Sequence, residues 1–144
     1  MLDTRDVRVG NWVLKLTGRD VKDQSFFEYK AIALEEYCYT FSRECFPIKL
    51  SPDILGECGF RHEFGDWYKN IPSADVAGGI PLLRYRHKEK AWYLGNLELP
   101  AQPLYVHQLQ NLYYALTRQE LDIELTRFEN LAMEHPIQLF TDAY

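Results

Sequence analysis

The chain has 144 residues, of which 47% are hydrophobic and 26% charged, and its formal net charge is −5 at pH 7. This balance excludes a disordered chain and predicts one globular domain, or one domain with a small annex, that buries its own core. An acidic chain does not attract nucleic acid through its overall charge, so binding of that kind needs a local basic patch.

The cysteines predict a reducing compartment. The chain has an odd number of cysteines and no C-x-x-C motif, which argues against a disulfide framework. They are Cys38, Cys45 and Cys58. The charged N-terminus is not followed by an apolar run, so we expect no signal peptide. No stretch is long and apolar enough to span a membrane. The sequence therefore predicts a cytoplasmic protein.

Residues 1–46 predict a β-rich N-terminal module. Gly10-Asn11 is typical of a turn or a bulge. Alternating or β-rich patterns predict strands at residues 12–17, 26–34 and 37–41. Short strands at this spacing predict an antiparallel arrangement, either a small β meander or a partial SH3-like barrel.

The clearest local signal in the chain is a short helix after Ser51. The Ser51 hydroxyl can cap the helix, and Pro52 suits its first position. Gly59 can take the left-handed conformation that ends a helix, and Phe60 can then fold back onto its apolar edge. We expect about two helical turns here.

An antiparallel sheet is expected after this helix. Its predicted strands lie within residues 60–68, 80–87 and 91–97. Gly65-Asp66 predicts a hairpin turn within the first of these stretches, and residues 87–90 predict the turn between the other two. Residues 69–79 predict a loop.

Residues 103–117 predict the main helix of the chain. Pro103 suits the first helical position, and the helix should end near Thr117. At about 100° per residue, one side of the helix gathers an apolar stripe. This stripe consists of Tyr105, Leu109, Leu112, Tyr113 and Leu116. It predicts that the helix packs across the sheet.

The opposite side of this helix gathers polar side chains without formal charge. They are His107, Gln110, Asn111 and Tyr114. A solvent-facing stripe normally carries Lys and Glu, so this composition is unusual. It is a candidate binding face for a partner or a ligand. The alternative is a buried seam whose polar groups bond to neighbouring backbone or lie under the N-terminal strands.

The C-terminal part predicts a peripheral strand and a tail. Leu121, Ile123 and Leu125 alternate with acidic residues, as in a strand. The predicted organisation has three parts: an N-terminal module at 1–46, an α+β core at 47–125, and a C-terminal tail at 126–144.

Three stretches together resemble a known family. They are residues 8–13, 47–60 and 105–117, of which His107-Gln-Leu-Gln-Asn-Leu-Tyr113 is the most specific. Their order and spacing resemble a family of small uncharacterised proteins from Bacteroides-type gut bacteria, often prophage or mobile-element associated. The resemblance covers most of residues 5–125. It implies a cytoplasmic accessory protein in such a setting, and it carries no activity, cofactor or catalytic residue.

One departure from this family lies at the end of the main helix. The family usually has Gly after the Ala-Leu-Thr sequence, whereas this chain has Arg118. A left-handed cap there would cost ~1 kcal/mol more with arginine than with glycine. Either the helix ends in another way, or this cost is tolerated.

The sequence predicts no metal site, cofactor or catalytic residue. Its four histidines lack H-x-x-x-H spacing, and none of them pairs with a nearby cysteine. Cys58 lies on the apolar edge of its predicted helix, where a thiol is usually inert. There is no G-x-S-x-G and no phosphate-binding glycine loop. An enzyme is therefore the less favoured interpretation.

A basic aromatic hairpin at 82–94 is the best candidate for nucleic-acid binding. Its candidate residues are Arg84, Tyr85, Arg86, Lys88, Lys90 and Trp92. Cations contact phosphates, and aromatic faces stack on bases. The alternative, which the overall acidity favours, is a solvated hairpin whose lysines prevent edge-to-edge pairing.

The fold predicted from the sequence is α+β, with an N-terminal β module followed by an antiparallel sheet that carries one short and one main helix. The leading prediction is that the chain is a non-enzymatic interaction protein. Its partner would be another protein or a second copy of the chain. The excess of Tyr and Trp and the uncharged stripe motivate this prediction. Nucleic-acid binding through the hairpin is the alternative.

Overall fold

The computed structural model describes residues 7–18, 28–34, 45–71 and 82–125. These residues contain two antiparallel sheets, one of three strands and one of five, together with two helices. The predicted α+β class is confirmed. Among these residues, no helix has both the length and the apolar character that crossing a membrane requires.

The chain divides into two compact units. The described residues of the first unit lie within 7–49, 105–108 and 124–125, and those of the second within 50–104 and 109–123. The first unit holds the three-stranded sheet, and the second holds the five-stranded sheet. The predicted boundary after residue 46 stays a prediction.

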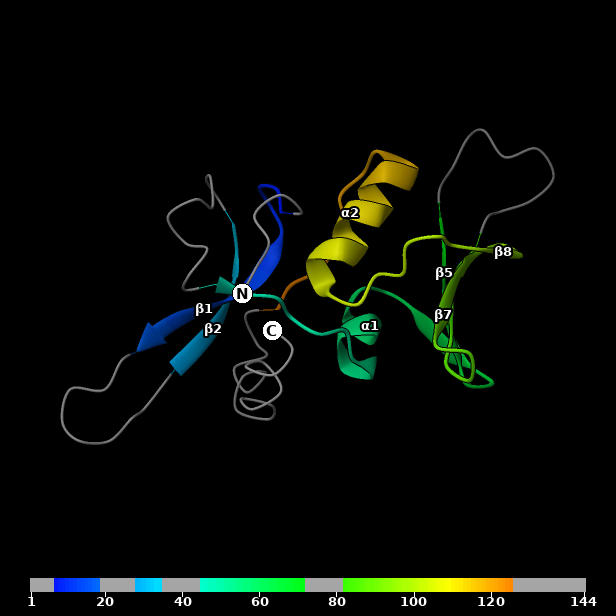
Figure 1. Ribbon diagram of the computed structural model, residues 1–144, viewed down its shortest axis with the longest axis horizontal. Helices are drawn as coiled ribbons and strands as arrows, with labels where there is room; N and C mark the ends of the chain where they lie inside the picture. Colours follow the sequence, from blue (N-terminus) through cyan, green and yellow to red (C-terminus); the bar gives the residue numbers. More distant parts are fainter. Residues whose placement is uncertain (1–6, 19–27, 35–44, 72–81, 126–144) are drawn as a thin grey trace. The chain divides into compact units, whose positions relative to one another are not determined.

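The three-stranded sheet has its first strand in the centre. Its strands are β1 (Trp12–Gly18), β2 (Glu28–Ala33) and β3 (Cys45–Phe46). Both neighbours pair antiparallel with β1, so the order is β2-β1-β3 (Figure 1). Its buried cluster consists of Val13, Leu34 and Cys45, with Val7 and Ile32 packed against it.

This sheet confirms two of the three strands predicted for the N-terminal module. The alternation at 12–17 and the β-rich stretch at 26–34 correspond to β1 and β2. The strand predicted at 37–41 lies outside the described residues. Closure into an SH3-like barrel therefore stays a prediction.

The turn predicted at Gly10-Asn11 is confirmed. Gly10 has a φ of +94°, and the Asn11 N–H donates to the Arg8 carbonyl at 3.1 Å. The Arg8 N–H in turn donates to the Asn11 side-chain oxygen at 2.8 Å. Asn11 is buried, and its backbone carbonyl accepts from the Leu34 N–H at 2.9 Å. The turn thereby fixes where β1 begins.

Helix α1 (Pro52–Glu57) begins as the sequence predicts. The Ser51 hydroxyl accepts a hydrogen bond from the Ile54 N–H at 3.3 Å, and proline occupies the first turn. Capping by Ser51 satisfies one of the backbone donors that every helix leaves free at its start. Ile54 and Leu55 are buried, so the helix docks by this edge.

The end of α1 also follows the prediction. Gly59 has a φ of +85°, which is favourable only for glycine. The Gly59 N–H donates to the Gly56 carbonyl at 3.1 Å, and the Phe60 N–H donates to the Leu55 carbonyl at 3.0 Å. This pair of bonds is the Schellman motif, and it turns the chain directly into the next strand.

The five-stranded sheet follows the chain order. Its strands are β4 (Arg61–Glu63), β5 (Asp66–Asn70), β6 (Leu82–Arg86), β7 (Ala91–Leu94) and β8 (Leu97–Glu98). Each strand pairs antiparallel with the next one, so the order is β4-β5-β6-β7-β8. Helices α1 and α2 lie on the same side of this sheet (Figure 1).

Three details of the predicted sheet were wrong. The first turn is at Phe64-Gly65, one residue earlier than predicted, because both residues take positive φ angles of 54° and 82°. Residues 69–70 belong to β5 and not to a loop, while 72–79 lie outside the described residues. The stretch 91–97 is not one strand, because Gly95, with a φ of +61°, turns the chain into β8.

Helix α2 (Val106–Thr117) begins later than predicted, because Pro103 is not its first residue. The Leu50 N–H donates to the Leu104 carbonyl at 3.1 Å, and the first N–H of the helix donates to the Ile48 carbonyl at 2.8 Å. These bonds keep the residues before the helix extended. A pairing partner far away in the sequence therefore overrides the local preference of proline.

Side chains stabilise both ends of α2. Gln108, at the third helical position, accepts a hydrogen bond from the Tyr105 N–H at 3.3 Å, which is half of a capping box. At the other end, the Thr117 hydroxyl donates to the Tyr113 carbonyl at 2.8 Å and accepts from the Gln119 N–H at 3.0 Å. The predicted end near Thr117 is confirmed.

Arg118 takes the left-handed conformation directly after α2. Its φ is 60°, and its N–H donates to the Tyr114 carbonyl at 2.8 Å. The helix therefore ends with the cap that glycine would favour, although arginine stands there. The steric cost of ~1 kcal/mol is tolerated.

Residues 121–125 alternate in burial but do not form the predicted strand. Leu121, Ile123 and Leu125 are buried, and the residues between them are exposed. No strand is assigned here among the described residues. The pattern therefore indicates an extended segment that packs by alternate side chains.

Candidate interaction surface

The alternation of the strands gives the five-stranded sheet two different faces. We call the side that carries Phe60, Leu83, Tyr85 and Trp92 the packed face. Leu83 is opposite Leu94, and Tyr85 is opposite Trp92, across β6 and β7. Because successive side chains of a strand point to opposite sides, Arg84 and Tyr93 lie on the other side, which we call the open face.

Aromatic rings and a lysine hold the packed face together. The Trp92 ring lies edge-on to Phe60 at 5.7 Å between centroids, and 5.3 Å from Tyr85. The Lys69 ammonium donates to the Cys58 carbonyl at 3.0 Å and lies 5.9 Å from the Tyr113 ring centroid. Since Cys58 caps α1 and Tyr113 belongs to α2, Lys69 of β5 joins both helices to the sheet.

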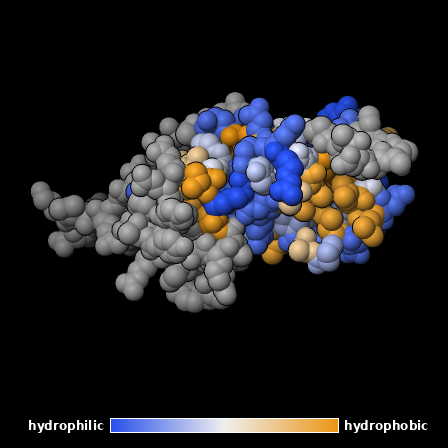
Figure 2. Space-filling model, turned by 90° about the horizontal axis from the view of Figure 1, so that it is seen from above, coloured by the Kyte–Doolittle hydropathy of each residue, from blue (hydrophilic) through white to orange (hydrophobic). Residues whose placement is uncertain are grey.

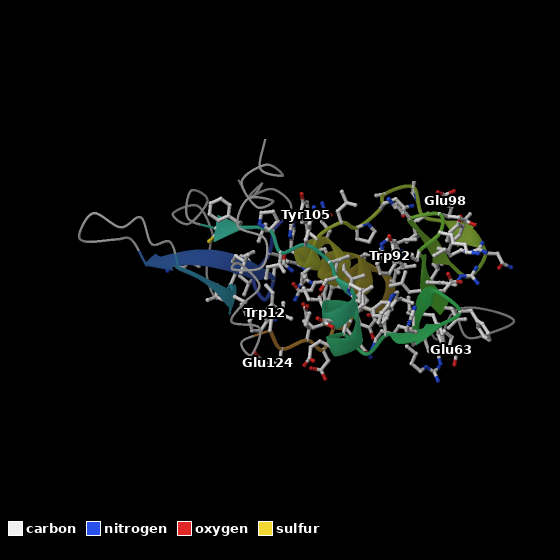
Figure 3. All side chains as sticks on the ribbon, turned by 90° about the horizontal axis from the view of Figure 1, so that it is seen from below. Trp12, Glu63, Trp92, Glu98, Tyr105 and Glu124 are labelled. Atoms are coloured by element: carbon white, nitrogen blue, oxygen red, sulfur yellow. The ribbon has the colours of Figure 1, made fainter. Side chains whose placement is uncertain are left out.

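The open face carries a row of side chains that crosses all five strands. The row runs through Arg61, Tyr68, Arg84, Tyr93 and Glu98, each directly opposite the next in the strand register. Arginine and tyrosine alternate along four of these positions. Glu63 and Glu98 lie at opposite edges of the sheet (Figure 3).

Arginines lie over tyrosine rings along this row. The guanidinium carbon of Arg61 is 5.1 Å from the Tyr68 centroid. Those of Arg84 and Arg86 are 5.8 Å and 5.6 Å from the Tyr93 centroid. Such contacts hold flexible arginines in place by about 0.5–1 kcal/mol each at exposed sites. We call Arg61, Tyr68, Arg84 and Tyr93 the arginine–tyrosine row.

Carboxylates surround the row and bind its tyrosines. The Tyr93 hydroxyl donates to Glu89, which also forms an ion pair with Arg86 at 3.3 Å. The pKa of Tyr93 is raised mainly by this hydrogen bond and, to a smaller extent, by burial. The pKa of Tyr68 is raised mainly by burial and, to a smaller extent, by a hydrogen bond with Glu63. Both phenols therefore stay neutral donors at physiological pH.

The structure distributes the predicted nucleic-acid-binding residues over both faces. Arg84 and Arg86 belong to the open face, while Lys88 and Lys90 are exposed in the turn that joins β6 to β7. Trp92 is only 2% exposed on the packed face, and Tyr85 lies beside it. A buried indole ring presents no face to a base, so Trp92 does not belong to a stacking surface.

The polar stripe on α2 is largely buried. His107 and Gln110 are 3% and 2% exposed, Asn111 is half-buried, and Tyr114 is 37% exposed. His107 stacks on Tyr105 with ring centroids 5.9 Å apart. The four residues share one helix, but only Tyr114 presents a large area to solvent. As a binding face, the stripe stays a prediction.

The described residues offer little to a metal ion or a nucleophilic reaction. No group of three or more His, Cys, Asp or Glu side chains among them can hold a metal. Burial raises the pKa of the Cys58 thiol to about 12, although Lys69 nearby lowers it. A thiol with this pKa is almost wholly protonated at neutral pH and is a poor nucleophile.

Sequence reasoning missed two members of the open face, Arg61 and Tyr68. Only their strand register brings them beside Arg84. A partial signal was present, because Arg84 and Arg86 occupy alternate positions of a predicted strand and so lie on one face. Using it required the partner of each strand, and the turn at Phe64-Gly65 was predicted one residue away.

Comparison of the chain with models of known families, with curated proteins and with solved structures found no match.

Proposed function

We propose that this chain is an interaction protein that binds a protein partner through the open face of its five-stranded sheet. The observation that carries the proposal is the arginine–tyrosine row, in which Arg61, Tyr68, Arg84 and Tyr93 are neighbours on four strands. Arginine and tyrosine are enriched at protein interfaces and among the residues that dominate binding energy. The mobile-element setting rests on the family resemblance and is part of the proposal.

The charges around the row support a protein partner over nucleic acid. The open face carries Arg61, Arg84 and Arg86 together with Glu63, Asp66 and Glu98. Nucleic-acid surfaces need an excess of positive charge, because phosphate contacts provide most of the affinity. Balanced charges around aromatic rings instead fit a protein surface, where they provide specificity and orientation.

Ordering of the row favours binding as well. Arginine normally loses much rotamer freedom when it is fixed in an interface, and this loss weakens association. The contacts of Arg84 and Arg86 with the Tyr93 ring restrict these side chains before a partner arrives. A partner therefore meets a surface that is partly ordered.

Affinity capture with matched variants tests the proposal. Tagged wild-type protein, Tyr93→Ala and Arg84→Ala would be incubated with extract of the native host, and the retained proteins identified by mass spectrometry. The control is Asn96→Ala, an exposed residue in the turn between β7 and β8. We expect at least one protein that the wild type and the control retain and both row variants lose. Identical retention by all four proteins would show that the row binds no partner.

Nucleic-acid binding remains the second candidate because Arg84 and Arg86 lie together on the Tyr93 ring. Electrophoretic mobility of random single-stranded DNA and RNA at about 50 mM salt tests it. A shift that salt removes, and that Arg84→Ala and Arg86→Ala weaken, would favour this candidate over the protein partner. Unchanged mobility would remove it.

A further inference from the structure

Strand β4 is an edge of the five-stranded sheet and has unusual exposure. Its three residues, Arg61, His62 and Glu63, are all exposed. It pairs with β5 on one side, and no other described strand pairs with its outer side. An open edge presents unpaired backbone groups to any second strand, which proteins usually prevent by covering or charging the edge.

The hairpin turn decides which backbone groups of β4 point outwards. Phe64-Gly65 is a two-residue turn, so the flanking Glu63 and Asp66 form a hydrogen-bonded pair. The next pair, His62 and Trp67, is then a non-hydrogen-bonded pair. The N–H and the carbonyl of His62 therefore point away from β5 and are oriented to bond to a further strand.

The charges of β4 are complementary to β4 itself. If a second copy pairs antiparallel with His62 opposite His62 of the second copy, Arg61 lies opposite Glu63 of the second copy. The two-fold symmetry repeats this pair on the other side. Opposite charges directly across an antiparallel pair stabilise it, whereas like charges there destabilise it. The charges of β4 therefore do not prevent it from pairing with β4 of a second copy.

Phe64 adds a second, independent observation at the same edge. Its side chain is 100% exposed, and its φ of 54° is the left-handed conformation that bulky residues avoid. The two-residue turn accounts for this φ angle, so the full exposure of the ring is the feature that marks this position. In the same antiparallel register, the Phe64 turn of one copy lies beside the start of β4 of the other, which would cover part of the exposed ring.

We propose that two copies of this chain associate through their β4 edges, antiparallel and centred on His62, which joins two five-stranded sheets into one. The inference goes beyond the proposed function, because it concerns the edge of the sheet and names the partner. Arg61 belongs to both surfaces, but Arg84→Ala and Tyr93→Ala test the row alone and Glu63→Arg tests the edge, so the two proposals fail separately.

Sedimentation of the purified chain over a range of concentrations tests this dimer with a charge swap. We expect the wild type to associate, and Arg61→Glu and Glu63→Arg each to raise the dimer dissociation constant at least about tenfold. The double variant Arg61→Glu/Glu63→Arg restores opposite charges across the interface, so it should return the constant to near the wild-type value. Asp122→Arg, a charge reversal at an exposed residue outside β4, is the control and should behave as the wild type.

Other outcomes would overturn the proposal. A wild-type chain that stays monomeric at the highest concentration would exclude it. A dimer that both single variants leave unchanged, or that the double variant fails to restore, would show that the copies meet elsewhere. Circular dichroism of each variant verifies that the monomer is still folded, so that loss of association is not loss of structure.

Discussion

Trp92 and Tyr93 are neighbours in β7 and end on opposite sides of the five-stranded sheet. Trp92 packs between Phe60 and Tyr85 on the face that the helices cover. Tyr93 lies on the open face, where Arg84 and Arg86 approach its ring. Both rings are large and aromatic, but one contributes to the core and the other to a surface.

This difference shows that basic and aromatic residues that are close together in the sequence need not lie on the same surface. The stretch 82–94 looks like one basic aromatic site, but alternation assigns its members to two surfaces. Conversely, Arg61 and Tyr93 are far apart in the sequence and belong to the same row. A surface of a sheet is therefore read across strands and not along one.

Truncation of the two neighbouring rings should give the largest contrast. We expect Trp92→Ala to lower the free energy of unfolding by about 3–5 kcal/mol, because it leaves a cavity beneath the helices. Tyr93→Ala should cost less than about 1 kcal/mol, because its ring is not part of the core. Urea unfolding monitored by circular dichroism measures both. Equal losses would mean that the two faces do not differ as described.

Two glycines near α1 should respond in opposite directions to the same substitution. Gly59 has a positive φ, and an added Cβ would lie 2.7 Å from the Lys69 ammonium on the packed face. We expect Gly59→Ala to destabilise the fold by about 1–3 kcal/mol. Gly56 lies in the helix with no atom within 4 Å of an added Cβ, so Gly56→Ala should stabilise by about 0.5–1 kcal/mol. Thermal unfolding distinguishes them, and a stabilising Gly59→Ala would contradict the left-handed cap.

The buried Cys58 thiol should make the free energy of unfolding fall as the pH becomes alkaline. Burial raises the pKa of Cys58 from its ordinary 9.0 to about 12 in the folded state. As the pH rises above 9, the thiol therefore loses its proton in the unfolded chain before it does so in the folded chain. The free energy of unfolding should then fall with rising pH until about pH 12. The limit for one group is about 1.4 kcal/mol per pH unit. Urea unfolding at pH 8, 9 and 10 measures this slope.

The matched variant for this measurement is Cys58→Ala. It should be less stable throughout because of the cavity, but it should lose the Cys58 contribution to the decline between pH 9 and 10. Burial raises the pKa of Tyr113 as well, and this second contribution begins above its ordinary value of 10. An unchanged slope in Cys58→Ala would assign the decline to other groups.

The elements that sequence reasoning predicted correctly are those with local signals. For α1, the capping hydroxyl, the proline and the terminal glycine all lie within residues 51–59, so no distant partner was needed. The same holds for the Gly10-Asn11 turn. The start of α2 was wrong because hydrogen bonds to residues 48–50 decide it, and these lie far away in the sequence.

The candidate site was predicted only in part for the same reason. Arg84 and Arg86 were chosen for their charge and belong to the open face, while Trp92 was chosen for its ring and is buried. Composition does not say on which side a residue lies. The register of the two-residue turn at Phe64-Gly65 was needed before Arg61 and Tyr68 could be placed beside them.

The chain order of the five-stranded sheet also has a consequence for the route of folding. Every strand pairs with its successor, so β4 to β8 close through contacts between neighbours in the sequence, which form early. The first unit instead needs residues 105–108 as well as its N-terminal strands, so its assembly requires the closure of a long loop. During synthesis, we therefore expect the five-stranded sheet to form before residues 105–108 have joined β1 and β2 and completed the first unit.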